Sequence, residues 1–268
     1  MKAYLQIVRP WVGALSAFAV LVGALVSGIY NPLVIIAVLV GFLHTSAGNT
    51  INDYFDYKTD KINRPKRPIP SGKISRKNAL YFSIILFASG IFLSLFLTLN
   101  NILIALLSCA LLILYSWRLK GIPLLGNISI GLLTSLSFIF GGILLGKLGL
   151  SVLILALISF AAVVGREIAK AIEDIDGDKK VKLRTLPIVT NKNFSSIIAI
   201  FFILFAVLFS PLPYLFNVLD FKYLATVIVA DILYLASCFV IFVNAAKAQR
   251  MMRASSFIAI LAFLIGAV

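Results

Sequence analysis

The sequence predicts an all-α integral membrane protein, a bundle of nine transmembrane helices around a central cavity. The mean hydropathy of the chain is +1.06. Only 13% of the 268 residues are charged and 61% are hydrophobic, so a polar surface cannot cover a soluble globule. The apolar residues are also collected into runs of about 20, the length that crosses a lipid bilayer.

Nine such runs follow one another along the chain. They lie at about 11–30, 32–52, 79–99, 101–117, 123–146, 149–169, 194–216, 222–246 and 254–268, and the last is short. Lys2 and Arg9 give the first run the look of a signal peptide. Pro10 and Trp11 interrupt that charged start, however, and equally apolar segments continue along the chain. We therefore expect one transmembrane domain, residues 1–268.

The basic residues predict the orientation of this domain. The formal net charge is +14, which might indicate a nucleic acid partner. The charge is placed unevenly, because all of the 24 lysines and arginines except Lys147 and Lys222 precede the first run or lie in every second connection. That asymmetry follows the positive-inside rule. We expect a multi-pass protein of the cell membrane with a cytoplasmic N-terminus, and no nucleic acid partner.

The acidic residues are concentrated in two places. Eight of the ten fall in two segments, at the ends of the second and sixth runs: Asp53, Asp56 and Asp60, then Glu167, Glu173, Asp174, Asp176 and Asp178. Both segments belong to the side predicted to be cytoplasmic. Acidic residues are otherwise nearly absent from the chain, so we expect the two clusters to share a function.

Each cluster forms a face if its helix continues. Should the second helix run through Asp60, the three aspartates 53, 56 and 60 lie within roughly 60° of one another around its axis. Asn49 and Asn52 border that face. In the sixth helix, the side chains of Glu167, Lys170, Asp174 and Asp178 follow the i, i+3, i+4 spacing of one stripe.

Two carboxylate faces favour a hard divalent cation. Carboxylates at this spacing repel one another, and the repulsion is poorly screened near the bilayer. Mg²⁺ takes a few carboxylates together with water and phosphate oxygens, and Asn49 and Asn52 would add neutral oxygens. Neither cluster contains His or Cys, which argues against zinc.

Basic residues accompany both clusters and would bind an anion such as a diphosphate. They are Arg64, Lys66, Arg67, Lys182 and Arg184. Three prolines stiffen the first basic loop. A solvated charged loop, an ion or phosphate transporter and a membrane anchor are the alternatives. Two acidic clusters at one membrane face disfavour the first and third, and the lack of carboxylates across the midplane disfavours the transporter.

These residues match signatures of a known family. "NDYFDYKTDKINRPKRPIPSG", Asn52 to Gly72, resembles the first signature of the UbiA superfamily of intramembrane prenyltransferases, N-D-x-x-D-x-x-x-D followed by a basic loop ending in R-P-x-P-S-G. "REIAKAIEDIDGDKKVKLRTLP", Arg166 to Pro187, resembles the second signature, D-x-x-x-D. "YSWRLK", Tyr115 to Lys120, is similar to a third element, Y-S-x-x-L-K. The resemblance covers essentially the whole chain.

The resemblance implies a Mg²⁺-dependent prenyltransferase with two Asp-rich motifs around a central cavity. The catalytic residues would be Asp53, Asp56, Asp174 and Asp178. The metal ligands would be these four aspartates with Asn49, Asn52 and Asp60. Diphosphate or an anionic acceptor would contact Arg64, Lys66, Arg67, Tyr115, Lys120, Lys170, Lys182 and Arg184. The loops at about 57–78 and 174–193 would cap the active site on the cytoplasmic side.

The same resemblance frames the partners that we expect. The donor would be an isoprenyl diphosphate, taken from the membrane lipid phase, and no obligate protein partner is expected. The form "EDIDGD" resembles that of the archaeal lipid, homogentisate and tetrapyrrole branches. Among these, the Lys- and Ile-rich composition favours the branch that acts on a lipid phosphate of archaeal membranes. We expect transfer of geranylgeranyl from geranylgeranyl diphosphate to the free hydroxyl of geranylgeranylglyceryl phosphate. The alternative acceptor is aromatic: 4-hydroxybenzoate, a quinone precursor or a tetrapyrrole.

Two polar residues inside the predicted spans remain outside this scheme. His44 lies one to two turns before Asn49 and would reach an acceptor hydroxyl as a base, although we favour a hydrogen-bonded packing role. Asp231 would be costly facing lipid, so we expect it to face the interior and pair with a polar neighbour.

Overall fold

The computed structural model describes residues 2–267 and contains only helices and turns in that range. The bounds are α1 Lys2–Val8, α2 Pro10–Val26, α3 Leu33–Phe55, α4 Tyr57–Asn63, α5 Arg76–Ser94, α6 Leu99–Trp117, the 3₁₀ turn η1 Leu119–Gly121, α7 Leu125–Gly142, α8 Leu150–Glu173, α9 Ile175–Lys180, α10 Leu186–Val189, α11 Lys192–Phe209, α12 Leu212–Leu215, α13 Phe221–Val240 and α14 Ala245–Gly266.

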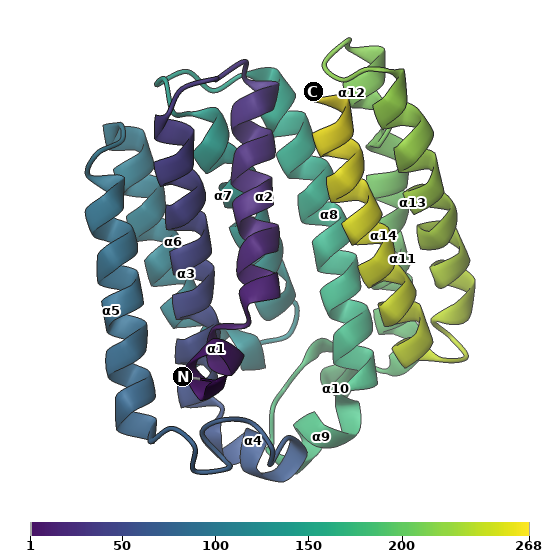
Figure 1. Ribbon diagram of the computed structural model, residues 1–268. Helices are drawn as coiled ribbons and strands as arrows, with labels where there is room; N and C mark the ends of the chain where they lie inside the picture. Colours follow the sequence, from purple (N-terminus) through teal and green to yellow (C-terminus); the bar gives the residue numbers. More distant parts are fainter. Residues whose placement is uncertain (1, 268) are drawn as a thin grey trace.

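Nine helical segments cross the bundle. Eight helices of the described chain are long and apolar enough to span a membrane, and α1 with α2, bent by 46°, makes the ninth. The chain accordingly begins at the lower end of the bundle and ends at the upper end (Figure 1). The prediction of an all-α membrane bundle is confirmed. Residues 1 and 268 of the predicted domain lie outside the described residues.

Two predicted boundaries are wrong. Residues 241–246 are not part of the eighth span, because α13 ends at Val240. The last helix begins at Ala245 instead of 254. The Asn244 side chain accepts a hydrogen bond from the Lys247 amide at 2.9 Å and caps α14. The basic residues that lower the local hydropathy therefore form the first turns of a helix.

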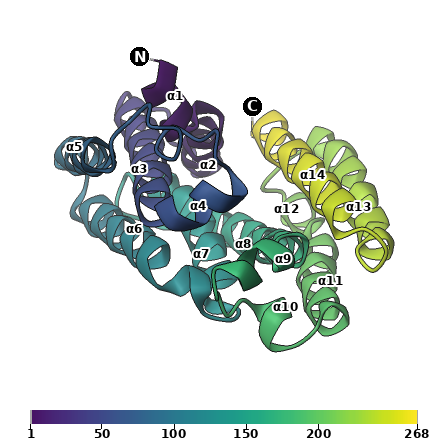
Figure 2. The ribbon, with the colours of Figure 1, turned by 90° about the horizontal axis from the view of Figure 1, so that it is seen from below.

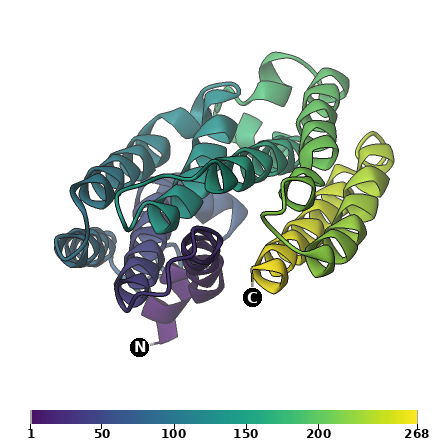
Figure 3. The same cartoon turned by 90° about the horizontal axis from the view of Figure 1, so that it is seen from above.

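The helices divide into two groups around α7 and α8. Viewed along the bundle axis, α2, α3, α5 and α6 lie on one side, and α11, α13 and α14 lie on the other (Figures 2 and 3). One apolar core contains residues of α7, α8, α11, α13 and α14, among them Phe138, Leu155 and Tyr223. A second core is formed by α2, α3, α6 and α7 around Val20 and Phe140.

Glycines permit the closest contact between helices. A Cβ atom built on Gly141 of α7 would lie 1.8 Å from the Val20 carbonyl oxygen of α2. One on Gly23 of α2 would lie 2.0 Å from the Phe138 carbonyl oxygen of α7. The α2–α7 crossing is thus a backbone-to-backbone contact, the mode that small residues allow in membrane bundles.

Candidate active site

The two acidic clusters lie at one end of the bundle. Helices α4 and α9, which follow the first and second clusters, both lie at the lower end in Figure 1 and near each other in the view from below in Figure 2. The segments predicted as loops at 57–78 and 174–193 therefore contain short helices. Which side of the membrane this end faces stays a prediction.

Both long helices stop at an aspartate. Asp56 ends α3 with φ −76° and ψ 3°, and Asp174 ends α8 with φ −87° and ψ 2°. The condition that each helix continues through Asp60 or Asp178 is not met, because a separate short helix begins after Asp56 and after Asp174. The short helices α4 and α9 carry Asp60 and Asp178.

Arginines neutralise two aspartates of the first cluster. The carboxylate of Asp53, only 3% exposed, is ion-paired with Arg9 and, at 3.1 Å, with Arg67. Arg67 also bonds Asp60 at 2.6 Å. Arg67 was predicted to bind an anion, and the structure places it against these carboxylates. Arg9 was assigned only to topology. Local sequence spacing could not reveal the pairing of Arg9 with Asp53, because 44 positions separate the two residues.

The two asparagines of the first cluster have different surroundings. The Asn49 side-chain amide donates to the Val8 carbonyl oxygen at 3.0 Å, which ties α3 to α1. Asn52 is half-buried, one turn before Asp56. Their predicted roles as metal ligands stay predictions.

Lys120 joins the two clusters. Its ammonium is ion-paired with Asp56 of the first cluster. It also lines a pocket together with Asp174 and Asp178 of the second cluster. Lys120 lies on η1, directly after α6. The ammonium therefore stands between carboxylates that are more than 100 positions apart in the sequence.

The second cluster lines the same pocket as the third sequence element. Glu167, Lys170, Asp174 and Asp178 all line it, so they do share one face as predicted, despite the break at Asp174. Burial and the neighbouring Asp174 raise the pKa of the Asp178 carboxyl above its usual range. Tyr115 contributes to the same wall from the end of α6.

The pocket contains a hydroxyl that the protein leaves unbonded. The Thr185 hydroxyl is buried, and no group of the described chain meets hydrogen-bonding geometry with it. The Asp178 carboxylate is close enough for the hydroxyl to act on its pKa but lies outside that geometry. A buried polar group without a partner costs free energy unless a ligand or water completes it. In the sequence, Thr185 appears only as part of the family signature, and the structure places its buried hydroxyl at the pocket.

A three-residue ion network supports the deep side of the pocket. Glu167 accepts from Arg166 at 3.1 Å and from Lys170 at 3.3 Å. The second cation of this network offsets part of the negative charge of Asp174 and Asp178 in the same pocket. From the sequence, Arg166 was assigned only to topology and Glu167 only to the acidic helix face. The spacing of these residues in the sequence does not reveal the ion network.

The remaining predicted anion-binding residues are exposed at the same end. Arg64 follows α4, and Lys66 lies in the proline-containing loop. Lys182 and Arg184 lie between α9 and α10 and point to solvent. The structure does not bring these four cations into the pocket, and their roles stay predictions.

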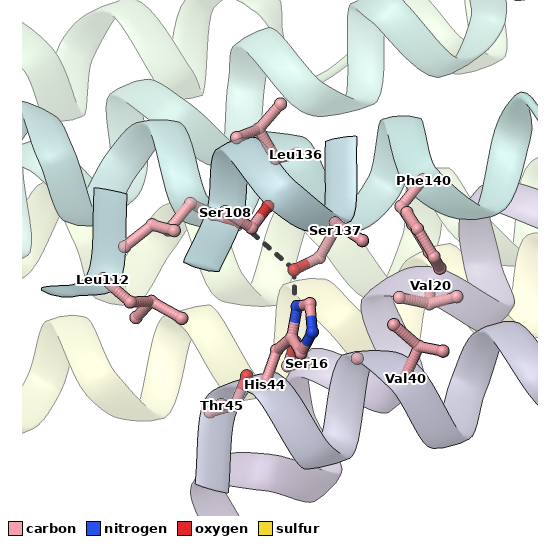
Figure 4. A pocket seen from close by; sticks show the side chains of 13 residues that line it. Ser16, Val20, Val40, His44, Thr45, Ser108, Leu112, Leu136, Ser137 and Phe140 are labelled. Carbon is pink, nitrogen blue, oxygen red and sulfur yellow. Dashed lines mark hydrogen bonds between the residues drawn. The ribbon is translucent and has the colours of Figure 1, made fainter. Parts of the chain in front are cut away.

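His44 lies in a different pocket, between α2, α3, α6 and α7. Ser16, Ser137 and Ser108 line that pocket with it, and the first two are hydrogen-bonded at 3.1 Å (Figure 4). His44 Nε2 is buried without a partner, so the predicted hydrogen bond is wrong. The helical rise places His44 about 13 Å from Asp53 along α3, which separates it from the carboxylates.

Asp231 has the polar partner that the sequence predicts. The Ser210 hydroxyl donates to its carboxylate at 2.6 Å, and the Tyr223 hydroxyl donates to the Ser210 carbonyl at 2.6 Å. These bonds join the end of α11 to the middle and the first turn of α13.

The potential metal-ligand atoms at the acidic clusters suit Mg²⁺. The nearby ligand atoms are carboxylate and amide oxygens, which hard divalent cations prefer. Within residues 2–267 no three His, Cys, Asp or Glu side chains are grouped closely enough to hold a metal, because Asp53, Asp56 and Asp60 point to arginine and lysine instead. One or two carboxylates with waters and phosphate oxygens satisfy Mg²⁺, so these residues fit a metal shared with a phosphate ligand.

The helical membrane bundle carries carboxylates and cations together at one end, an arrangement typical of intramembrane enzymes that act on phosphate-containing substrates. Comparisons with known proteins identify the family. The model of the UbiA prenyltransferase family matches residues 11–261. The digeranylgeranylglyceryl phosphate synthase of Methanococcoides burtonii is 42% identical, with 100% of both chains covered. The chain belongs to the UbiA prenyltransferase family, and it is a prenyltransferase.

Solved structures share the fold over the whole chain. A structure of digeranylgeranylglyceryl phosphate synthase superposes with a TM-score of 0.81 at 36% identity, covering 99% of this chain and 98% of the other. A UbiA homologue from Archaeoglobus fulgidus bound to DMAPP and Mg²⁺ gives a TM-score of 0.75 at 19% identity, with 98% of each chain covered. The second likeness shows the fold alone.

Proposed function

We propose that the protein transfers a geranylgeranyl group from geranylgeranyl diphosphate to the free hydroxyl of geranylgeranylglyceryl phosphate, with Mg²⁺ as cofactor. Relatives and a solved structure that carry the synthase name support this acceptor. The A. fulgidus homologue was solved with a prenyl diphosphate and Mg²⁺. The observation that carries the proposal is the position of Lys120. It is ion-paired with Asp56 of the first cluster and lines one pocket with Asp174 and Asp178 of the second.

The reaction needs charge neutralisation more than covalent help from the protein. The C1–O bond of the allylic diphosphate breaks, and its electron pair leaves with the diphosphate. The acceptor hydroxyl oxygen then forms the ether bond to C1, and its proton passes to the departing diphosphate or to water. When bound, Mg²⁺ neutralises the charge that develops on the diphosphate. Fixed cations of the chain, Lys120 and Arg67, add electrostatic stabilisation in a site with little water.

The proposal assigns roles to the predicted residues. The carboxylates of Asp53, Asp56, Asp174 and Asp178 hold the metal and are the catalytic set, with Asn49, Asn52 and Asp60 as supporting oxygen ligands. The exposed cations hold the outer diphosphate oxygens or the acceptor phosphate. The exposed cations are Arg64, Lys66, Lys182 and Arg184. Tyr115 and Lys170 position the diphosphate from the pocket wall.

Topology and location belong to the same proposal. The lysines and arginines concentrate at the end of the bundle that carries the acidic clusters, which supports a cytoplasmic active site under the positive-inside rule. The segments 57–78 and 174–193 lie at that end and would cap the site in a multi-pass protein of the cell membrane. A cysteine at exposed Lys58 should react with an impermeant maleimide only from the cytoplasmic side. Labelling of intact cells from outside would contradict this topology.

Thr185 provides a test of the pocket. Replacing it by Val should lower kcat/KM about 30-fold, because a ligand oxygen loses a buried hydrogen bond. The thermal stability of the protein alone should change little, since the Thr185 hydroxyl has no partner in the described chain. Thr185→Ser should retain activity within about 3-fold, a range below the loss for one hydrogen bond. Equal losses in both variants would contradict the assignment.

The proposed function is tested by product analysis. Purified protein is incubated with geranylgeranyl diphosphate, Mg²⁺ and an equimolar mixture of geranylgeranylglyceryl phosphate and 4-hydroxybenzoate, and products are identified by mass spectrometry. We expect a diether phosphate that disappears with EDTA. A prenylated benzoate would replace the lipid acceptor by an aromatic one. No consumption of the donor, with the protein folded, would contradict prenyl transfer from this donor.

A further inference from the structure

The N-terminal elbow brings a second arginine to the acidic site. Arg9 separates α1 from α2 and has φ 49° and ψ 70°, in the left-handed region that is unfavourable for a residue other than glycine. Pro10 follows and provides no N–H for a continuous helix. A conformation of this kind persists only where the surrounding structure holds it, and such positions concentrate at functional sites.

Contacts on both sides of Arg9 hold the elbow. The Asn49 side chain donates to the Val8 carbonyl oxygen at 3.0 Å, and this carbonyl lies directly before Arg9. Ile7 and Val8 are buried in a small core with Ile69 and Ile74 of the basic loop. The elbow and the loop that carries Arg67 are therefore one packed unit.

This unit directs two guanidinium groups at the same atom. Arg9 and Arg67 both bond Oδ1 of Asp53. The Arg9 side chain is 32% exposed, whereas that of Asp53 is 3% exposed. A guanidinium has five N–H groups, so the partly exposed Arg9 retains free donors while it neutralises the buried carboxylate.

From this geometry we propose that Arg9 is a positioning residue that exchanges partners during the reaction cycle. Without donor, Arg9 is the counter-ion of Asp53. When Asp53 turns to the metal that accompanies the donor, Arg9 transfers its hydrogen bond to the diphosphate. The inference rests on the proposed function, because it requires a metal and a diphosphate at this site.

This exchange of partners means that Arg9 affects the affinities for the metal and for the diphosphate in opposite directions. Arg9 and a divalent cation compete for one carboxylate oxygen, so the arginine weakens binding of metal alone. Arg9 and the diphosphate attract one another, so the arginine strengthens binding of diphosphate with metal. A purely structural arginine, whose loss distorts the site, would change both affinities in the same direction.

The test measures binding in the absence of turnover. Mn²⁺, which replaces Mg²⁺ as a paramagnetic probe, is titrated into full-length protein in detergent and followed by electron paramagnetic resonance. Inorganic pyrophosphate is then titrated by calorimetry at saturating Mn²⁺. In Arg9→Gln we expect Mn²⁺ alone to bind about 3- to 10-fold more tightly and pyrophosphate about 10-fold more weakly, as for loss of one nearby charge.

Two further variants control for charge and for folding. Arg250→Gln removes the same charge from an exposed position of α14, and both affinities should stay within about 2-fold, since exposed charges are screened. Arg9→Lys keeps the charge on a shorter side chain and should retain pyrophosphate affinity within about 3-fold while Mn²⁺ alone binds more tightly. If Arg9→Gln does not fold, Arg9→Lys carries the test, and weaker Mn²⁺ binding in it would overturn the inference.

The outcomes separate the inference from the proposed function. Changes of the same direction in Arg9→Gln, or none, overturn the partner exchange and leave prenyl transfer intact. Wild-type protein that binds neither Mn²⁺ nor pyrophosphate overturns both. Opposite changes support the exchange even if the acceptor is not the one proposed, because neither measurement uses an acceptor.

Discussion

Asp56→Asn and Asp174→Asn should each lower kcat/KM for prenyl transfer by about 10³-fold, roughly 4 kcal/mol of transition-state stabilisation. The two residues belong to different clusters and end different helices. Either substitution keeps the side-chain shape and removes one negative charge from the proposed metal site. The expected losses are measured from initial rates of product formation, at several Mg²⁺ concentrations in order to separate weak metal binding from slow chemistry.

The two aspartates should also act as a unit. If both hold the same metal–diphosphate assembly, the double variant should lose little more activity than either single variant, as for residues of one catalytic group. Asp220→Asn provides a matched control, because Asp220 is exposed and caps α13 at the opposite end of the bundle. Asparagine also caps helices well, so this variant should retain full activity. Activity of either Asp56→Asn or Asp174→Asn within 10-fold of wild type would contradict the metal assignment.

Gly141→Ala should destabilise the fold by about 3 kcal/mol, although it adds a single methyl group. The added Cβ would lie 1.8 Å from the Val20 carbonyl oxygen, a backbone atom that no side-chain rotation can move. The α2–α7 crossing must therefore open, and it joins the N-terminal helices to the centre of the bundle. We expect the Tm in detergent, followed by circular dichroism, to fall by roughly 10 °C.

A second glycine controls for the substitution itself. Gly149 precedes α8 with φ −77°, and a Cβ built there meets no other atom within 4 Å. Gly149→Ala should leave the Tm nearly unchanged. A similar small effect of Gly141→Ala would show that the two helices separate without cost. Gly23→Ala, at the same crossing, should resemble Gly141→Ala.

The helical membrane bundle and the two acidic clusters could be recognised because they depend on local patterns. Apolar runs of bilayer length identify spans without knowledge of their neighbours. The clustering of Asp53, Asp56, Asp174 and Asp178 stands out because carboxylates are otherwise rare in this chain. Hydropathy failed where a helix starts with basic residues, as α14 does at Ala245.

The arrangement inside the site could not be predicted in the same way. The expected carboxylate faces depended on α3 and α8 continuing without a break, but both helices end at an aspartate. Such breaks depend on what each helix end packs against. The sequence alone also could not pair Arg9 with Asp53, 44 positions away, or direct Lys120 to Asp56, 64 positions away.

By itself the sequence determined that this protein is a helical membrane bundle with two acidic motifs and basic loops suited to a metal-bound diphosphate. Composition and short-range spacing carry that information, since each span and motif is defined within about 20 residues. Only the tertiary structure decided which cation faces which carboxylate, that the Thr185 hydroxyl is buried without a hydrogen-bond partner, and that the N-terminal elbow reaches Asp53. Those features depend on contacts between helices distant in sequence, and the packing of the whole bundle sets them.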